Sequence, residues 1–170
     1  MQRTAELRQK IQDAMNEQLK EELTSAYQYL AMAAYLETVP LPGAAHWMRL
    51  QAQEEVAHAM KFYEFISDRN GRVMLHAIPE PRANFGSPLE VFEQALANEQ
   101  KVTAAIMDLY ELAIQEKDYV SHSFLQSFLN EQVEEEKTAS HIVDMMRLAG
   151  DKGPALFMLD KDLASRSSAD

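Results

Sequence analysis

The chain has 170 residues, of which 46% are hydrophobic and 25% charged, and its formal net charge is −11. This length suits a single domain over residues 1–170, and the lack of cysteine excludes disulfides, zinc–thiolate sites and iron–sulfur clusters. The acidic composition argues against nucleic acid or anionic lipid as a partner and favours cations.

The sequence has no apolar run long enough to span a membrane, and its first ten residues lack the apolar stretch of a signal peptide. We therefore expect a cytoplasmic protein that does not insert into a membrane.

Glycine and proline cluster in three places, and the stretches between them have helical periodicity. In chain order, the pattern predicts helices near 4–37, 43–70, 87–117 and 120–149, and a short fifth helix near 154–165. Ser87, Pro88 and Glu90 form a helix start signal with a capping box, and Gly150 is a plausible stop.

Four long helices favour an all-α four-helix bundle over residues 4–149. The segment between the second and third helices is long and contains several prolines, so it could cross the bundle from end to end. That crossover would make these two helices parallel, whereas the short connections elsewhere make their neighbours antiparallel.

Each long predicted helix has an apolar face, and each face contains one glutamate near its middle. These glutamates are Glu22, Glu55, Glu99 and Glu135, and His58 lies one turn after Glu55 on the same face. Because the midpoints of similar helices in a bundle lie at similar height, we expect these side chains to meet in one buried layer.

Four carboxylates in a buried layer cannot all stay ionised without partners, since desolvation and mutual repulsion both oppose their charge. Protons or cations must neutralise them, and two divalent cations would balance four carboxylates. Oxygen ligands with one imidazole and no thiolate suit iron or manganese better than structural zinc. The pattern therefore predicts a dinuclear metal centre inside the bundle.

The chain resembles the bacterial non-haem ferritins in the stretches KEELTSAYQY (20–29), AQEEVAHAM (52–60), NEQ (98–100), NEQVEEEK (130–137) and GPALFMLDKDL (153–163). This resemblance implies a ferritin-like bundle with a crossover between helices two and three and a short C-terminal helix. It also implies ferroxidase activity, in which O2 or H2O2 oxidises Fe²⁺ at two iron sites per subunit. Twenty-four subunits would form a hollow shell that stores the ferric mineral.

The resemblance also implies roles for individual residues. Glu22, Glu55 and His58 match the ligands of a first iron, and Glu55 matches the carboxylate that bridges both irons. The remaining matches are Glu99 and Glu135 as ligands of the second iron, Gln132 close by, and Tyr29 as a tyrosine beside the centre. Without the resemblance, Tyr29 would be interpreted as an ordinary core residue.

A third iron site occurs in some bacterial ferritins. Its residues match Glu54, Glu131 and Glu134, together with Glu135. From the pattern alone, the first three would form a solvated acidic face, so both interpretations stay open.

The resemblance favours a protein without haem. Bacterioferritins place a haem-binding methionine directly after the second-helix glutamate and repeat Glu-x-x-His in the fourth helix. Here Val56 and Thr138 stand at the methionine and histidine positions.

Three other functions stay open at this point. A di-iron enzyme of the rubrerythrin type usually has a cysteine-ligated iron, and this chain has no cysteine. A mini-ferritin that protects DNA has its ligands between subunits, whereas four helices of this chain supply a full set. A bundle without catalysis could use buried acids to select a partner, and metal content would distinguish it.

Overall fold

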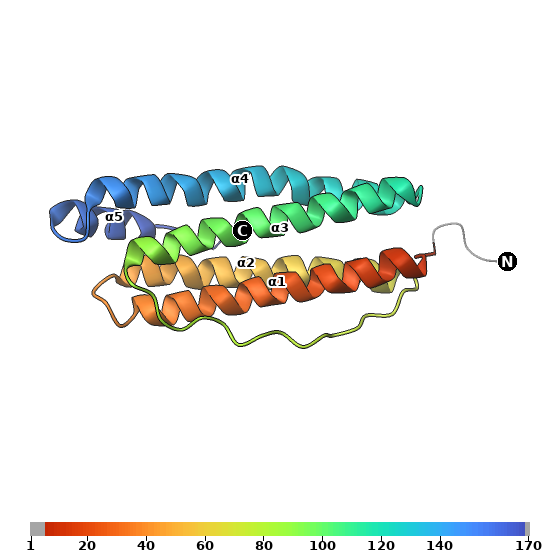
Figure 1. Cartoon of the computed structure of the whole chain (residues 1–170), viewed down its shortest axis with the longest axis horizontal. Helices are drawn as coiled ribbons and strands as arrows, with labels where there is room; N and C mark the ends of the chain where they lie inside the picture. The colour runs from red at the N-terminus through yellow and green to blue at the C-terminus, as the bar shows by residue number, and fades with distance from the viewer. Residues whose placement is uncertain (1–5, 169–170) are drawn as a thin grey trace.

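The computed structural model describes residues 6–168, which form helices joined by turns and one long extended segment (Figure 1). The helices are α1 (Gln9–Leu36), α2 (Pro42–Asp68), α3 (Pro88–Gln115), α4 (Tyr119–Ala149) and α5 (Pro154–Ala164). The first four lie along one long axis, and α5 packs at one end against α2 and α4. The predicted all-α bundle is confirmed. Within the described range, no helix is both apolar and long enough to cross a membrane.

Most predicted helix ends agree closely with the structure. Ser87 caps α3 as expected, because its hydroxyl accepts the Glu90 N–H at 3.1 Å. Gly150 ends α4 with a φ of 74°, a left-handed conformation that glycine adopts without strain.

The start of α1 differs from the prediction, which placed it at residue 4. Residues 4 and 5 lie outside the described range, and the helix begins at Gln9 after an extended Arg8. The Leu7 N–H donates to the Arg69 carbonyl at 3.1 Å, so the backbone here bonds to the end of α2 instead of continuing a helix.

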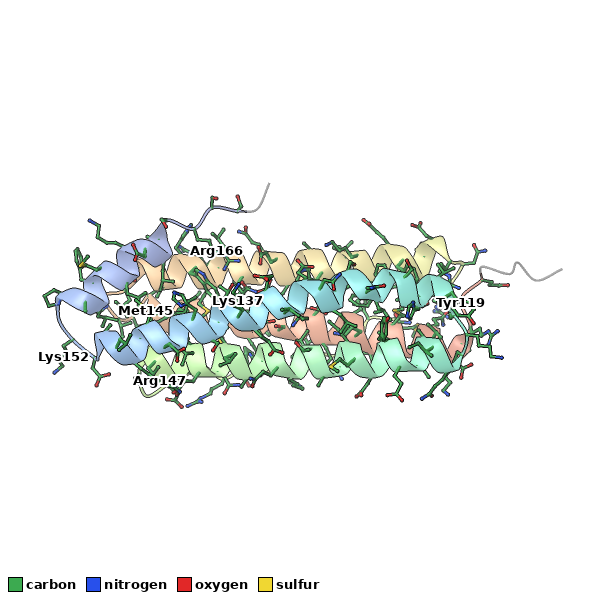
Figure 2. All side chains as sticks on the ribbon, turned by 90° about the horizontal axis from the view of Figure 1, so that it is seen from above. Tyr119, Lys137, Met145, Arg147, Lys152 and Arg166 are labelled. Atoms are coloured by element: carbon green, nitrogen blue, oxygen red, sulfur yellow. The ribbon has the colours of Figure 1, made fainter. Side chains whose placement is uncertain are left out.

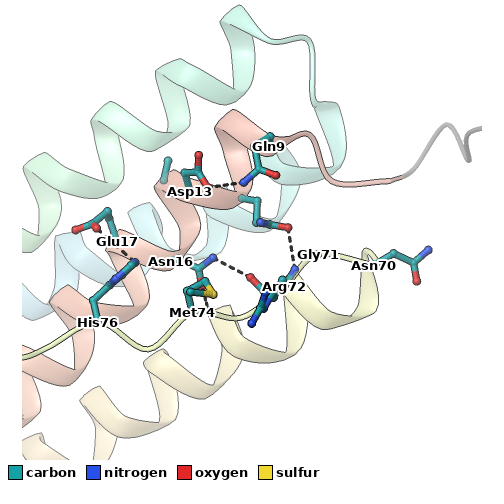
Figure 3. Close-up of a pocket in the computed structure, with 11 residues that line it drawn as sticks. Gln9, Asp13, Asn16, Glu17, Asn70, Gly71, Arg72, Met74 and His76 are labelled. Carbon is teal, nitrogen blue, oxygen red and sulfur yellow. Dashed lines mark hydrogen bonds and ion pairs between the residues drawn. The ribbon is translucent and has the colours of Figure 1, made fainter.

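The predicted crossover is confirmed, and α2 and α3 run in the same direction (Figure 1). The first residues of the crossover form hydrogen bonds with side chains of α1 (Figure 3). The buried Asn16 side chain donates to the Arg72 carbonyl at 3.0 Å and accepts the Met74 N–H at 2.7 Å, and Gln12 accepts the Arg72 N–H at 2.8 Å. These side chains satisfy backbone groups that an extended segment would otherwise leave to water.

Two apolar clusters fill the bundle, and a polar layer separates them. In each long helix the break between the clusters contains the predicted glutamate. The cluster residues nearest the break are Leu19 and Tyr29 in α1, Ala52 and Phe62 in α2, Ala95 and Val102 in α3, and Phe128 and Ile142 in α4. The core itself therefore places the four glutamates at a common level.

The short helix α5 closes one end of the bundle by capping α2. The Asp160 carboxylate accepts the Gly43 N–H at 3.1 Å and the Ala44 N–H at 2.8 Å. Leu41, the residue before α2, has no side-chain cap of its own, so α5 supplies the partner that the helix start requires. Leu159 and Leu163 join the apolar cluster beneath.

We predict that Gly43→Ala detaches α5. A Cβ at position 43 would lie 1.9 Å from the Asp160 carbonyl oxygen, so the two backbones must separate and the cap is lost. The free energy of unfolding should fall by about 1–2 kcal/mol, and the amides of α5 should exchange faster with solvent.

Gly86→Ala is a matched control, because a Cβ there meets the flexible end of the Glu90 side chain instead of backbone. Equal protection of the α5 amides in both variants would contradict this account of the docking.

Candidate metal centre

The polar layer between the two apolar clusters contains the residues that sequence analysis selected. Glu22, Glu55, Glu99 and His58 are buried, with exposed fractions of 0%, 1%, 1% and 4%. Glu135 is half-buried on the adjacent face of α4. All four long helices thus contribute a carboxylate to the layer.

Glu22, Glu55 and His58 form a compact group whose possible ligand atoms lie within 4.8 Å of one another. The His58 Nδ1 is 3.8 Å from the Glu22 Oε2 and 3.7 Å from the Glu55 Oε2. Among residues 6–168, neither of these two buried oxygens has a hydrogen-bond partner. Because unsatisfied buried oxygens are costly, the group is suited to bind a cation.

The other oxygen of each carboxylate is held by a neutral amide. The Gln18 Nε2 donates to the Glu22 Oε1 at 2.9 Å, and the Gln51 Nε2 donates to the Glu55 Oε1 at 3.3 Å. These bonds orient the carboxylates and leave the second oxygen of each directed toward His58.

His58 is positioned by its second nitrogen. The Nε2 lies 3.1 Å from the Glu131 Oε1, which leaves Nδ1 facing the two buried carboxylates. Burial alone would lower the pKa of His58, but the hydrogen bonds and charges of Glu131, Glu55 and Glu22 raise it to about 11. A proton therefore supplies the positive charge here, and a metal ion would replace it.

The second half of the layer is built around Glu99. The Tyr29 hydroxyl donates to the Glu99 Oε1, and the Gln132 Nε2 donates to the Glu99 Oε2 at 3.1 Å. The Gln51 Nε2 also donates to the Glu135 Oε2 at 3.0 Å. Since Gln51 contacts both Glu55 and Glu135, it links the two halves.

The carboxyl groups of the layer hold protons more tightly than ordinary glutamates. Burial, with the charge of Glu55, raises the pKa of Glu22 well above its usual value. Burial and the charge of Glu135 raise the pKa of Glu99 to about 7, and burial likewise raises the pKa of Glu55 and of Glu135. This is the behaviour expected of acids gathered in a buried site.

Three glutamates that match a third iron site lie outside the polar layer, and each is close to a positive side chain. They are Glu54, Glu131 and Glu134. The Glu54 Oε2 lies 2.9 Å from the Arg166 Nη2, and Glu131 pairs with His58. Glu134 lies on the exposed surface of α4, 3.8 Å from Lys137. A pocket of about 400 Å³ opens beside His58 and is lined by Glu54 and Glu131, so solvent reaches this side of the centre.

Sequence analysis selected Gln132 but missed the amides of Gln18 and Gln51, and it also missed Arg166. Gln18 and Gln51 each stand four residues before the glutamate that they orient, a spacing that places both side chains on one helix face. That spacing could have revealed them. The contact between Arg166 and Glu54 joins distant parts of the chain and has no local signal.

Comparison with known proteins identifies the family. A model of the ferritin-like domain family matches residues 12–149. This range contains most of α1 and all of α2, α3 and α4. It therefore includes the four glutamates of the polar layer. The chain belongs to the ferritin-like family. Two relatives named bacterial non-heme ferritin confirm the predicted resemblance.

Similar proteins cover nearly the whole chain. A bacterial non-heme ferritin of Staphylococcus saprophyticus is 42% identical over 161 residues, covering 95% of this chain and 96% of that protein. A bacterial non-heme ferritin of Bacteroides fragilis is 40% identical over 158 residues, covering 93% of this chain and 98% of that protein.

The fold is also found in solved structures. An open pore ferritin from the hyperthermophilic archaeon Archaeoglobus fulgidus matches with a TM-score of 0.93 and 46% identity, covering 95% of this chain and 99% of that chain. An engineered closed form of the same ferritin matches with a TM-score of 0.94 and 45% identity, covering 96% and 99%. These archaeal ferritins therefore share the fold over nearly the whole length of both chains.

We predict that Glu99 makes the stability of the metal-free protein depend on pH. The folded pKa of Glu99 is about 7, above the value of about 4.3 in an unfolded chain. A raised folded pKa contributes stability that is fully present below the unfolded pKa and is lost as pH rises through about 7. In Glu99→Gln, the free energy of unfolding should therefore fall less than in the wild type between about pH 5 and about pH 8.

Urea unfolding in the presence of a chelator measures this dependence. Glu64→Gln serves as the control, because Glu64 is exposed on α2. If Glu99→Gln lost stability with pH as steeply as this control, Glu99 would not hold its proton in the folded state.

Proposed function

We propose that this protein is an iron-storage ferritin that oxidises Fe²⁺ at a di-iron centre inside its own bundle. The observation that carries the proposal is the pair of buried, unpartnered oxygens of Glu22 and Glu55, which face the His58 Nδ1. The relatives named bacterial non-heme ferritin support iron as the cation.

Two ferrous ions are the substrate, and the inner residues would bind them. Glu22 and His58 would hold the first ion, Glu99 and Glu135 the second, and Glu55 would bridge both. Gln51 supports this assignment because its amide contacts both Glu55 and Glu135. Carboxylate oxygens and one imidazole suit iron, and the buried setting supplies a dry pocket.

The chemistry is the removal of one electron from each ferrous ion. O2 accepts the two electrons and two protons and leaves as H2O2, or H2O2 accepts them and leaves as two water molecules. Anionic oxygen ligands stabilise Fe³⁺ over Fe²⁺, which favours the oxidation. Metal binding also releases the protons that Glu99 and its neighbours hold, because ligands must be deprotonated.

Tyr29 and Gln132 would position Glu99 for this reaction. The Tyr29 side chain is fully buried and its hydroxyl donates to one oxygen of Glu99, while Gln132 donates to the other. Two directed hydrogen bonds would fix the plane of the Glu99 carboxylate before a metal ion arrives.

Storage requires that copies of the chain enclose a cavity, and we propose the 24-subunit shell of the ferritins. Apolar side chains left exposed on the single chain support assembly. Leu148 near the end of α4 is 82% exposed, and Phe157 and Met158 on α5 are 64% and 67% exposed. Contact with other copies would bury these surfaces. We further propose a cytoplasmic location and a protein without haem.

A di-iron enzyme that stores no iron is the main alternative. It would share the inner residues but would bind only two iron ions per subunit. A bundle without catalysis would bind none tightly. Iron capacity and oxidation rate therefore separate the three functions.

We predict that Glu99→Ala slows the oxidation of Fe²⁺ at the centre by at least about tenfold. Mutation of a residue that hydrogen-bonds a metal ligand typically lowers activity by that factor, and loss of the ligand itself should lower it further. Aerobic addition of Fe²⁺, followed by absorbance of the ferric product, measures the initial rate. Glu64→Ala on the exposed face of α2 is the control and should keep the wild-type rate.

The same titration measures iron capacity. A large assembly that takes up many more than two iron ions per subunit supports storage. Saturation at two ions in a small oligomer would mean a di-iron enzyme, and an unchanged rate in a folded Glu99→Ala protein would refute the ligand assignment.

A further inference from the structure

The amide of Gln51 lies between carboxylates of two helices. Its side chain is buried on α2, and its Nε2 donates to the Glu55 Oε1 at 3.3 Å and to the Glu135 Oε2 at 3.0 Å. The second of these bonds joins α2 to α4. Figure 2 shows α4 along the length of the bundle and labels Lys137, two residues after Glu135, near the middle of that helix.

The oxygen of the same amide has no hydrogen-bond partner. Within residues 6–168, the Gln51 Oε1 shares this condition with the Glu22 Oε2 and the Glu55 Oε2 of the metal centre. The oxygens of Gln18 and Gln132, the other amides of the layer, are not among these buried and unpartnered atoms. Because a buried amide oxygen normally accepts a hydrogen bond, the Gln51 Oε1 requires a different explanation.

The amide head has the spacing of a metal ligand. Two oxygens on neighbouring corners of an octahedron lie about 3.0 Å apart when each metal–oxygen distance is about 2.1 Å. The Gln51 Nε2 lies 3.0 Å from the Glu135 oxygen and 3.3 Å from the Glu55 oxygen. An oxygen atom in the place of this nitrogen would therefore be able to share one ion with both carboxylates.

A rotation of the terminal amide exchanges the two atoms and leaves the rest of the side chain in place. The last side-chain bond of glutamine has broad rotational preferences, so this rotation is easy. Without a metal ion the nitrogen faces the carboxylates, because it donates and they accept. When a cation occupies those carboxylate oxygens, the nitrogen loses both acceptors and its hydrogens would face a positive charge. The oxygen is then the favoured atom, and it has no hydrogen bond to lose.

We propose that Gln51 is a further metal ligand, whose Oε1 turns toward the ion that Glu55 and Glu135 hold. This inference rests on the proposed function, because it concerns one of the same two ferrous ions. Amide and carboxylate oxygens are both hard donors for divalent ions. The amide is neutral, so four carboxylates still balance two divalent cations. Gln51 thus orients carboxylates when the centre is empty and completes the coordination when it is filled.

Gln18 offers a matched control that separates orientation from ligation. It stands four residues before Glu22, as Gln51 stands four residues before Glu55, and its Nε2 donates to the Glu22 Oε1 at 2.9 Å. Both glutamines are buried. Replacement of either one by leucine removes an orienting hydrogen bond, but only Gln51→Leu would also remove a ligand.

The test is an anaerobic calorimetric titration of the assembled, full-length protein with Fe²⁺. In the wild type we expect two tight ions per subunit, and Gln18→Leu should still bind both. In Gln51→Leu, one of the two ions should bind at least roughly tenfold more weakly than in Gln18→Leu, because loss of a ligand exceeds loss of its support.

Crystals of the wild type loaded with Fe²⁺ without oxygen give a second, direct readout. The Gln51 Oε1 should lie about 2.0–2.3 Å from the ion beside Glu55 and Glu135, the range of metal–oxygen ligand distances. An amide that stayed about 3 Å or more from that ion would overturn the proposal.

Each result decides one claim. Equal weakening in Gln51→Leu and Gln18→Leu would overturn ligation by Gln51, while two tight ions in the wild type would still support the proposed function. Absence of the two tight ions in the wild type would overturn the proposed function, and this inference with it. If Gln51→Leu did not assemble, the distance from the Oε1 to the ion in the wild-type crystals would still decide.

Discussion

The structure depends on one electrostatic constraint, which is that carboxylates from four helices share a layer closed above and below by apolar side chains. Two oxygens in this layer, one on Glu22 and one on Glu55, have no hydrogen-bond partner in the described part of the chain. Burial of these carboxylates is costly unless protons or cations neutralise them, and burial accordingly raises the pKa values of all four. The neighbouring features follow from the need to bind those cations and to release them.

The protein neutralises its inner and outer acids by different means. In the inner layer, amides and one phenol orient the carboxylates, and the protonated His58 faces Glu22 and Glu55. Gln51 shows the principle most clearly, because one amide nitrogen orients Glu55 and Glu135 together. Glu54, Glu131 and Glu134, outside this layer, pair with positive side chains, and the 2.9 Å contact between Arg166 and Glu54 is the shortest of these pairs.

Much of this arrangement could be predicted from the sequence, because it is set by local periodicity. The glutamate in the middle of each apolar helix face predicted the height of the site along the bundle. The break between the two apolar clusters falls at that height in all four helices. The crossover was predictable because proline and glycine prevent a helix there. Ser87 caps the start of α3 and Gly150 caps the end of α4, as expected, since capping depends on a few adjacent residues.

Other features could not be predicted because they arise from contacts between distant segments. Leu7 bonds to Arg69, which shortens the start of α1, and Asp160 caps α2 from the far end of the chain. The pair of Arg166 and Glu54 belongs to the same class. The resemblance, and not periodicity, selected Glu134 together with Glu54 and Glu131. The structure leaves the Glu134 side chain exposed beside Lys137, as the pattern alone predicts.

The measurement that tests the central claim most directly is anomalous diffraction at the iron edge from crystals soaked in Fe²⁺ without oxygen. The account predicts two iron ions in the polar layer, one beside Glu22 and His58, one beside Glu99 and Glu135, with Glu55 in contact with both. Crystals that took up iron only on the surface, and left the Glu22 and Glu55 oxygens without a metal ion, would contradict it.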